Sequence, residues 1–170
     1  SYNFAKLIIK LINNVASVIN ADPRANSLLK VVFMPDYKVS LAEVLIPAAN
    51  VSIQSSTAGF EASGTGNMKF ALNGALTVGT YDGANIEIRE AVGADNFYLF
   101  GLREEQIQEM RRTNSYNPRK YYEDSDYIKR ILNAINSNMF CEKDYVLLFK
   151  VIYEELLNRD YYFILADFCL

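Results

Sequence analysis

The amino-terminal part of the chain carries one helical stripe of apolar residues, followed by shorter apolar runs. Leucine, isoleucine and valine recur at helical spacing over residues 4–19, which predicts an amphipathic helix. Residues 30–34 are β-prone and precede a Pro-Asp pair, so they predict a short buried strand. Ser40 has Glu43 three residues later, the spacing of a capping box, and predicts a helix that Pro47 ends.

The middle of the chain alternates β-prone runs with helical segments. Strands are predicted at residues 51–54, 76–80 and 97–100, with one helix running to about Leu72 and another over residues 84–91. This alternation favours a parallel sheet with helices on its faces, and ligands bind such sheets beyond the carboxyl ends of the strands. The sequence therefore predicts an α/β fold, a Rossmann-like parallel sheet with helices on both faces, and the loop after Gln54 lies at a ligand-binding end.

After Gly101 the chain becomes richer in charge, and nothing in it indicates a second domain. Helices are predicted over residues 103–112, 126–136 and 145–157, with a tyrosine-rich connection at 116–127 and an apolar tail at 161–170. The tyrosine pairs in these segments suit either a stacking platform for sugars or bases or packing at the edge of the core, and the second use is more common. Residues 1–170 are thus expected to belong to one domain.

Composition excludes several classes of function. With 51% hydrophobic and 22% charged residues and a net charge of -3, the chain lacks the basic surface of a nucleic-acid-binding protein. Its longest apolar stretches, residues 7–12 and 41–49, are shorter than the ~20 residues that span a bilayer, so no membrane association is expected. The absence of histidine excludes a histidine-activated nucleophile and, with two cysteines, argues against a metal site. Few cysteines and no signal peptide predict a cytoplasmic protein.

A long loop of small residues, 55–69, is the most unusual segment of the chain. Gly64 and Gly66 allow the backbone to approach a ligand closely, and the amides of Thr65 and Gly66 open a helix. Unpaired amides at a helix start form an anion site suited to a phosphate ester. Lys69 follows within the first turn, where the helix dipole disfavours the ammonium form and so favours a nucleophilic amine.

Such a lysine beside a phosphate site suits covalent attachment of pyridoxal phosphate, although spacing alone leaves alternatives. A P-loop requires Gly-Lys followed by Ser or Thr, whereas Lys69 stands between Met68 and Phe70. The dinucleotide fingerprint also fails, because position 69 is neither glycine nor alanine. For the residues taken by themselves, a purely structural glycine turn is the more common explanation.

The segment 61–69, read together with Leu72-Asn73-Gly74-Ala75-Leu76-Thr77 and Asp82-Gly83-Ala84-Asn85, closely resembles the glycogen, starch and maltodextrin phosphorylase family. Residues 37–49 fit the same family, and the resemblance extends over essentially the whole chain. It implies part of the carboxyl-terminal, cofactor-binding domain of a two-domain glycosyltransferase of type B architecture. The amino-terminal domain and the basic residues that grip orthophosphate are then expected to lie outside this chain.

The resemblance also implies a site and a reaction. It assigns pyridoxal phosphate to Lys69, Thr65, Gly66, Tyr37, Lys38 and Gln54, with Lys69 as the covalent attachment point and catalytic residue, and the hydroxyls of the glucosyl unit to Glu61, Ser63 and Gly64. The implied reaction transfers the terminal glucosyl unit of an α-1,4-glucan to inorganic phosphate, giving glucose 1-phosphate with retained configuration. The parent enzyme is implied to be a homodimer, and the isolated chain is expected to show little activity.

Some positions depart from the family pattern without removing an assigned ligand. Phe60 stands where a small polar or charged residue is common, Ile53 replaces an acidic residue and Lys38 an arginine. Two other functions remain as alternatives. A non-catalytic remnant would bind cofactor or another chain, and a sugar-nucleotide transferase of the same architecture would leave Lys69 without a role.

Overall fold

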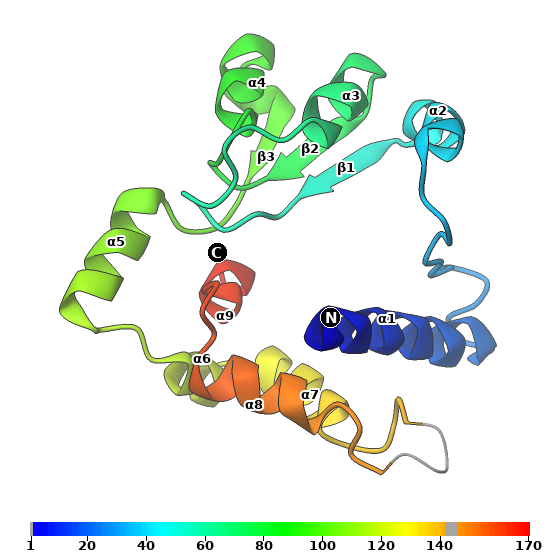
Figure 1. Ribbon diagram of the computed structural model, residues 1–170, viewed down its shortest axis with the longest axis vertical. Helices are drawn as coiled ribbons and strands as arrows, with labels where there is room; N and C mark the ends of the chain where they lie inside the picture. The colour runs from blue at the N-terminus through cyan, green and yellow to red at the C-terminus, as the bar shows by residue number, and fades with distance from the viewer. Residues whose placement is uncertain (1, 142–145) are drawn as a thin grey trace. The chain divides into compact units, whose positions relative to one another are not determined.

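The computed structural model of the chain describes residues 2–141 and 146–170. They form two compact units, each with its own packing (Figure 1). The helical unit comprises residues 1–36 and 122–159, and the sheet unit comprises residues 37–121 and 160–170. The candidate site residues all belong to the sheet unit.

The sheet unit contains three parallel strands in sequence order. They are β1 (Val51–Gln54), β2 (Leu76–Gly79) and β3 (Phe97–Leu99), in the order β1-β2-β3. Ser52 lies opposite Thr77, and Thr77 lies opposite Phe97, so the neighbouring strands are in parallel register. The predicted α/β class and parallel sheet are confirmed.

Helices α3 (Gly66–Leu72) and α4 (Asn85–Val92) connect the strands, and both lie on one side of the sheet, where they contact each other (Figure 1). This arrangement follows because right-handed crossovers that step in one direction put their helices on one face. The remaining elements before β3 are α2 (Val39–Ala48) and the short 3₁₀ helix η1 (Ala94–Asn96).

The two faces of the sheet differ in burial. Ser52, Thr77 and Phe97 are buried, whereas the alternating positions Ile53 and Tyr98 are 69% and 58% exposed. Since side chains alternate between faces along a strand, α3 and α4 cover one face, and the other is apolar and open within the described residues. The prediction of helices on both faces is therefore met on one face of this unit.

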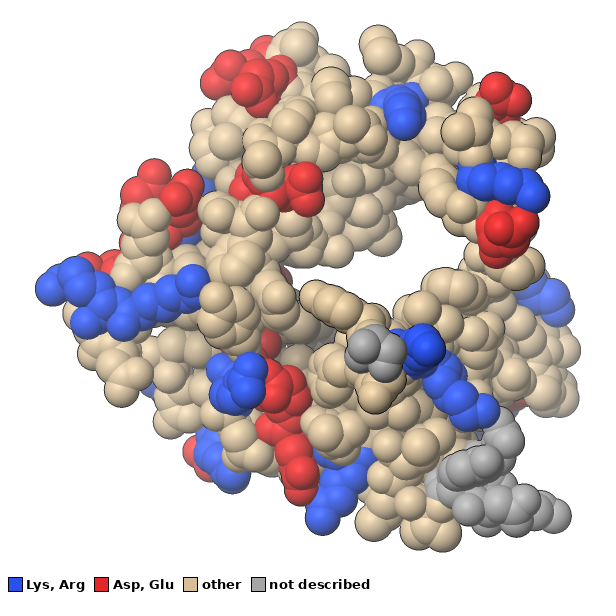
Figure 2. Space-filling model, in the orientation of Figure 1, with Lys and Arg blue, Asp and Glu red and all other residues tan. Residues whose placement is uncertain are grey.

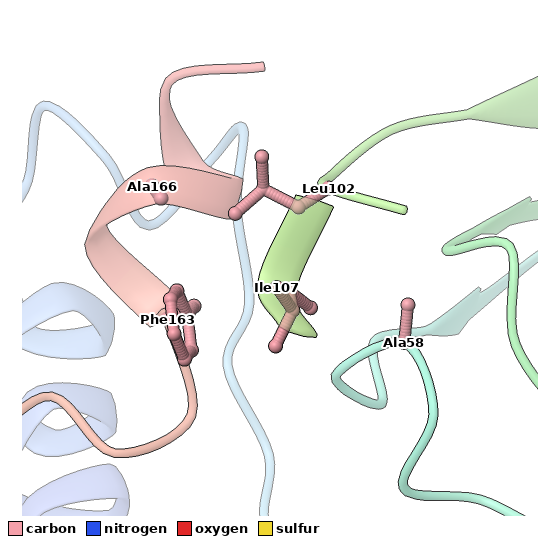
Figure 3. Close-up of a cluster of buried hydrophobic side chains, with 5 residues drawn as sticks. All are labelled: Ala58, Leu102, Ile107, Phe163 and Ala166. Atoms are coloured by element: carbon pink, nitrogen blue, oxygen red, sulfur yellow. The ribbon is translucent and has the colours of Figure 1, made fainter. Parts of the chain in front are cut away.

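A cluster of buried hydrophobic side chains packs beyond the carboxyl end of the sheet. It joins the loop after β1, α5 (Glu104–Thr113) and α9 (Ile164–Phe168) through Ala58, Leu102, Ile107, Phe163 and Ala166 (Figure 3). Ile107 of α5 and Phe163, which precedes α9, point toward one another. This cluster fixes one end of the loop that carries the candidate site, because Ala58 belongs to both.

Two carboxylates tie the end of the chain to this cluster. Asp160 is buried and accepts hydrogen bonds from the amides of Ile164 and Leu165 at 3.0 and 2.8 Å, which secures the start of α9. Asp167 accepts from the amide of Leu102 at 2.8 Å, and burial raises the pKa of its carboxyl. The segment that the sequence predicted as an apolar tail is thus a short helix held by polar contacts.

Tyr116 is expected to stabilise this region in a pH-dependent way. Its hydroxyl donates to Asp160 at 2.5 Å, and burial, followed by this hydrogen bond, raises the pKa of Tyr116 above its ordinary 10.0. The Tyr116→Phe variant should lose about 1–2 kcal/mol of unfolding free energy at pH 8, because the buried carboxylate loses a donor.

The sign of the pH effect follows from proton binding. Above pH 10.0, the ordinary pKa of tyrosine, the unfolded chain releases the proton of Tyr116 while the folded chain keeps it, so this residue's contribution falls as pH rises. Urea unfolding at pH 8 and pH 10.5 should therefore show a smaller difference between wild type and Tyr116→Phe at the higher pH. A difference that stays constant or grows would contradict the assignment.

The helical unit contains α1 (Asn3–Ala21), α7 (Asp126–Ile135) and α8 (Lys150–Asn158). The carboxamide of Asn14 in α1 donates to the carbonyl of Phe140 at 2.6 Å, which ties α1 to the segment after α7. All three predicted helices are present, but the last begins at Lys150 after a turn at 146–149, later than predicted, and Tyr145, its predicted start, lies outside the described residues. Helix α1 is long and apolar enough to cross a membrane by length and composition, a test that core helices and signal sequences also pass.

Four local predictions are wrong. Residues 30–34 form no strand. The backbone groups of Val31 hydrogen-bond to the side chain of Asn20 instead of to a neighbouring strand. The Asn20 carboxamide accepts from the Val31 amide at 3.0 Å and donates to the Val31 carbonyl at 2.8 Å. Helix α2 begins at Val39, with the extended residue Lys38 as its cap, so Ser40 lies inside the helix and caps nothing.

The third and fourth errors concern the end of α2 and the connection after α5. Pro47 lies within the last turn of α2 instead of after it. The tyrosine-rich connection contains α6 (Pro118–Asp124), which starts with proline at its first position and with Asn117 accepting from the amide of Arg119 at 3.1 Å. Proline at the first helical position and asparagine before it are ordinary helix-start signals.

Charged side chains are mixed over the surface. On the face that Figure 2 shows, lysine and arginine lie among aspartate and glutamate without a large patch of either sign. This distribution agrees with the net charge of -3.

Candidate functional site

Lys69 lies one turn into α3 with its side chain exposed to solvent. Its amide donates to the carbonyl of Thr65 at 3.2 Å, the first hydrogen bond of the helix. Within residues 2–141 and 146–170 its ammonium group forms neither a hydrogen bond nor an ion pair. The amine is therefore free to react with a ligand at the start of α3.

The amides of Thr65 and Gly66 stand at the start of α3 without an acceptor in the described part of the chain. The amide of Met68, two residues after Gly66, is occupied, because it donates to the side-chain oxygen of Asn67 at 2.9 Å. A Cβ atom built on Gly66 would meet nothing within 4 Å, so there is open space beside it. Two free donors, open space and a free lysine suit a phosphate ester that also carries an aldehyde.

The carboxylate of Asp82, which follows β2, holds the loop before α3 through hydrogen bonds. The two oxygens of this buried carboxylate accept from the amide of Gly59 at 2.9 Å and from the amide of Glu61 at 3.0 Å. Phe60, between them, donates its amide to the carbonyl of Thr57 at 3.0 Å. Three consecutive amides are thus satisfied, and the backbone that presents Glu61 is fixed in position.

A chain of buried polar side chains fixes the other end of the loop. Asn67 donates to the side chain of Asn85 and to the carbonyl of Ser63, both at 3.1 Å. Asn85 in turn donates to the carbonyl of Thr80 at 3.1 Å, and the hydroxyl of Thr80 donates to the carbonyl of Ser56 at 2.7 Å. The starts of α3 and α4 are therefore linked to each other and to the carboxyl end of β2.

Gly83 is expected to tolerate no side chain. Its φ is +50°, and an added Cβ would lie 2.6 Å from the carbonyl oxygen of Ser63, whose partner is the amide of Ala84 at 2.7 Å. The Gly83→Ala variant should lose on the order of 3 kcal/mol of unfolding free energy, because backbone strain adds to a clash with backbone.

Gly74→Ala is the matched control for this prediction. Gly74 also has a positive φ, +88°, but open space surrounds it. Its replacement should therefore show the conformational part alone, about 1–2 kcal/mol. Equal losses in denaturant unfolding of the two variants would mean that the contact between Gly83 and Ser63 contributes nothing.

The residues assigned to the sugar lie together at the surface of the loop. Glu61 and Ser63 are exposed, and the hydroxyl of Ser63 donates to the carbonyl of Gly64 at 3.1 Å. Gly64 has φ +78° and turns the chain toward the start of α3. Glu61, Ser63, Gly64, Thr65 and Lys69 thus share one continuous loop and helix start.

The other assigned cofactor residues come from neighbouring elements. Tyr37 is 61% exposed, and Lys38 is the cap of α2, a helix that contacts α3. Gln54 ends β1, and its side chain donates to the hydroxyl of Ser52 at 2.8 Å. Tyr37 and Lys38 directly precede α2, and Gln54 ends β1, so they adjoin elements that contact α3; neither Tyr37 nor Gln54 hydrogen-bonds to Lys69 in the described ranges.

The sequence predicted no supporting contacts for the residues that hold the site loop. Asp82, Asn85 and Asn67 were part of the family resemblance, but their contacts with the loop were not predicted. The available signal was their chemistry, because acidic and amide side chains beside glycines commonly bond to backbone amides in turns.

Comparison with known proteins gives the family of this chain. Residues 1–170 match the model of the carbohydrate phosphorylase family. A glycogen phosphorylase of Chlamydia trachomatis serovar D is 56% identical over 167 residues, 98% of this chain and 20% of that protein. The glycogen phosphorylase of Synechocystis is 53% identical over 98% of this chain and 19% of its own length. The human brain form is 49% identical over 98% of this chain and 20% of its own length. The chain spans about one fifth of the length of these relatives.

Proposed function

Since the chain belongs to the carbohydrate phosphorylase family, we propose that it is the cofactor-binding part of an enzyme that phosphorolyses α-1,4-glucans. The observation that carries this proposal is the free side chain of Lys69 beside the free amides of Thr65 and Gly66. The relatives named glycogen phosphorylase, at 47–56% identity, support the same reaction.

We propose that pyridoxal phosphate binds at this position. Lys69 would hold the aldehyde end of the cofactor, the amides of Thr65 and Gly66 would hold its phosphate, and Tyr37, Lys38 and Gln54 would line it. When bound, the cofactor supplies a phosphate group that exchanges a proton with inorganic phosphate. The unpaired state of Lys69 supports this assignment, because an ion-paired ammonium would need to lose its partner first.

The sugar is held by the loop that precedes α3. The carboxylate of Glu61 accepts hydrogen bonds from glucosyl hydroxyls, and Ser63 and the backbone of Gly64 add further polar contacts. In the reaction, the bond from the anomeric carbon to the next sugar breaks to leave an oxocarbenium-like glucosyl centre, and an oxygen of inorganic phosphate bonds to that carbon on the face that the glucan leaves, so the configuration is retained. The departing oxygen of the shortened glucan takes up the proton that inorganic phosphate gives up and becomes a hydroxyl, and glucose 1-phosphate is released.

The rest of the parent enzyme completes the architecture. We place the chain in the carboxyl-terminal domain of a cytoplasmic, homodimeric, two-domain glycosyltransferase of type B, with further helices on the open face of the sheet. The exposed apolar side chains of Ile53 and Tyr98 support a second layer, because a sheet face of this kind is covered in α/β domains. By itself the chain lacks one wall of the site and catalyses little phosphorolysis.

Reductive trapping tests the proposal. The chain is incubated with pyridoxal phosphate at equimolar ratio, reduced with borohydride and digested, and the peptides are identified by mass. The expected result is one dominant pyridoxyl adduct on Lys69. An adduct spread evenly over the exposed lysines, or none, would refute the assignment.

A further inference from the structure

A groove with a volume of about 820 Å³ lies between α1, α7 and the segment after α7. Leu11 and Val15 are four residues apart and share one face of α1, and Ile131 and Ile135 share one face of α7 in the same way. The described residues that line the groove all belong to the helical unit, so it shares no residue with the candidate site. Its volume lies within the roughly 300–1,000 Å³ of small-molecule sites in proteins.

Hydrogen bonds fix the walls of this groove. The carboxamide of Asn14 on α1 donates to the carbonyl of Phe140, a lining residue, at 2.6 Å. The hydroxyl of Ser137 donates to the carbonyl of Ala134 at 2.7 Å and accepts from the amide of Met139 at 3.1 Å, and both of these partners also line the groove. Walls that are fixed in this way lose little conformational entropy when a ligand binds.

Arg130 is the only charged residue among the described residues that line the groove. It is exposed, and its side chain forms neither a hydrogen bond nor an ion pair within residues 2–141 and 146–170. Asp126, one turn earlier on α7, pairs instead with Lys129 at 3.5 Å, and helix α1 carries no carboxylate. Leu11 and Val15 are half-buried and give the groove an apolar floor. The groove therefore combines an apolar floor with a positive group that lacks a partner in the described chain.

We propose that this groove binds a free aliphatic monocarboxylate of medium chain length, such as dodecanoate, with the hydrocarbon chain in the groove and the carboxylate on Arg130. The inference goes beyond the proposed function and uses none of its residues. Helix α7 has 10 residues and is therefore about 15 Å long, close to the length of extended dodecanoate. Each methylene that the groove removes from water lowers the Kd about fourfold.

Charge and polarity favour this ligand over other classes. The fork of a guanidinium forms two parallel hydrogen bonds with a carboxylate, which a hydroxyl or an ammonium group cannot accept. A sugar would place hydroxyls against the half-buried side chains of Leu11, Val15 and Phe140, which offer them no hydrogen-bond partner. A purely apolar ligand would leave Arg130 without a partner. The groove matches a molecule with one apolar chain and one anionic end.

Dodecanoate binding by the whole chain, below the concentration at which dodecanoate forms micelles, tests the proposal. Saturation-transfer NMR should show transfer to the methylene protons of the ligand, and a titration gives its Kd. Octanoate has a shorter chain and should bind at least about tenfold more weakly. Arg130→Gln should raise the Kd for dodecanoate about fivefold, because the cation is lost, and Arg130→Lys should lie between this variant and wild type.

Arg159→Gln is the matched control. Arg159 is an exposed arginine of the same unit, lies outside the groove and pairs with Glu155 at 3.1 Å, so its change should leave the Kd unchanged. No dodecanoate binding by the wild type overturns the proposal. An equal Kd in Arg130→Gln, or for dodecyltrimethylammonium, which has the same chain with a cationic end, also overturns it. Trapping of pyridoxal phosphate on Lys69 reports on the proposed function alone and is independent of these outcomes.

Two further outcomes would identify another occupant of the groove and overturn the proposal. Binding of the chain to vesicles of phosphatidylglycerol, without binding of monomeric dodecanoate, would identify a lipid surface. Self-association that Ile131→Glu abolishes, without dodecanoate binding, would identify a contact between copies of this chain. Circular dichroism of each variant checks that it is folded, so that a lost signal reports on the groove.

Discussion

The Lys69→Arg variant is expected to yield no pyridoxyl adduct at position 69 after borohydride reduction and to lose most of the total incorporation. Arginine keeps the positive charge at the start of α3, but its guanidinium stays protonated and cannot attack an aldehyde. The variant therefore removes the nucleophile and changes the local electrostatics little. Incorporation is measured by mass and by absorbance of the reduced cofactor.

Lys120→Arg is the matched control for Lys69→Arg. Lys120 is also an exposed lysine on a short helix, α6, but it has no glycine loop before it. Incorporation should be the same as in wild type. If both variants incorporate equal amounts, exposed lysines react without selection, and Lys69 has no special role.

Replacement of Asp82 by alanine is expected to lower the unfolding free energy by about 3 kcal/mol, because it leaves two backbone donors without their charged acceptor. The amides of Gly59 and Glu61 lose their bonds of 2.9 and 3.0 Å, and the loop between them is released. Maltotetraose binding should weaken in the same variant, since Glu61 no longer has a fixed backbone. Denaturant unfolding measures the first effect, and a saturation-transfer NMR titration with maltotetraose measures the second.

Glu90→Gln serves as the comparison for Asp82→Ala. Glu90 is an exposed carboxylate on α4, and its change should alter the unfolding free energy by no more than about 0.5 kcal/mol. Asp82→Asn should lie between the two, because the carboxamide retains one acceptor oxygen but turns a donor toward the second amide. An Asp82→Ala variant as stable as Glu90→Gln would show that the loop is held by other contacts.

The strands and helices that were predicted correctly are those whose signal is local. The parallel strands at 51–54 and 76–79 alternate with helical segments in the sequence itself. Residues 30–34 have the same β-prone character but no neighbouring strand in the described chain, and Asn20 takes the backbone bonds of Val31 instead. A strand depends on its partner, which a short run of residues does not specify.

The site shows the same division between local and distant contacts. Thr65, Gly66 and Lys69 were predicted together because they are neighbours in the sequence and share one helix start. The contact of Asp82 with Gly59 joins residues on different sides of a strand and a helix. No periodicity or spacing carries that information, so the support of the loop became visible only in the folded chain.

The double hydrogen bond from Asp82 has a consequence for local opening. The loop at 59–61 and the turn after β2 share one carboxylate, so neither segment can leave the native state without breaking the bonds of the other. The amides of Gly59 and Glu61 should therefore exchange with deuterium at nearly the same rate, as one cooperative unit. Cofactor bound through Lys69 at the far end of the loop would slow that shared exchange, which makes these two protons reporters of occupancy that lie outside the ligand itself.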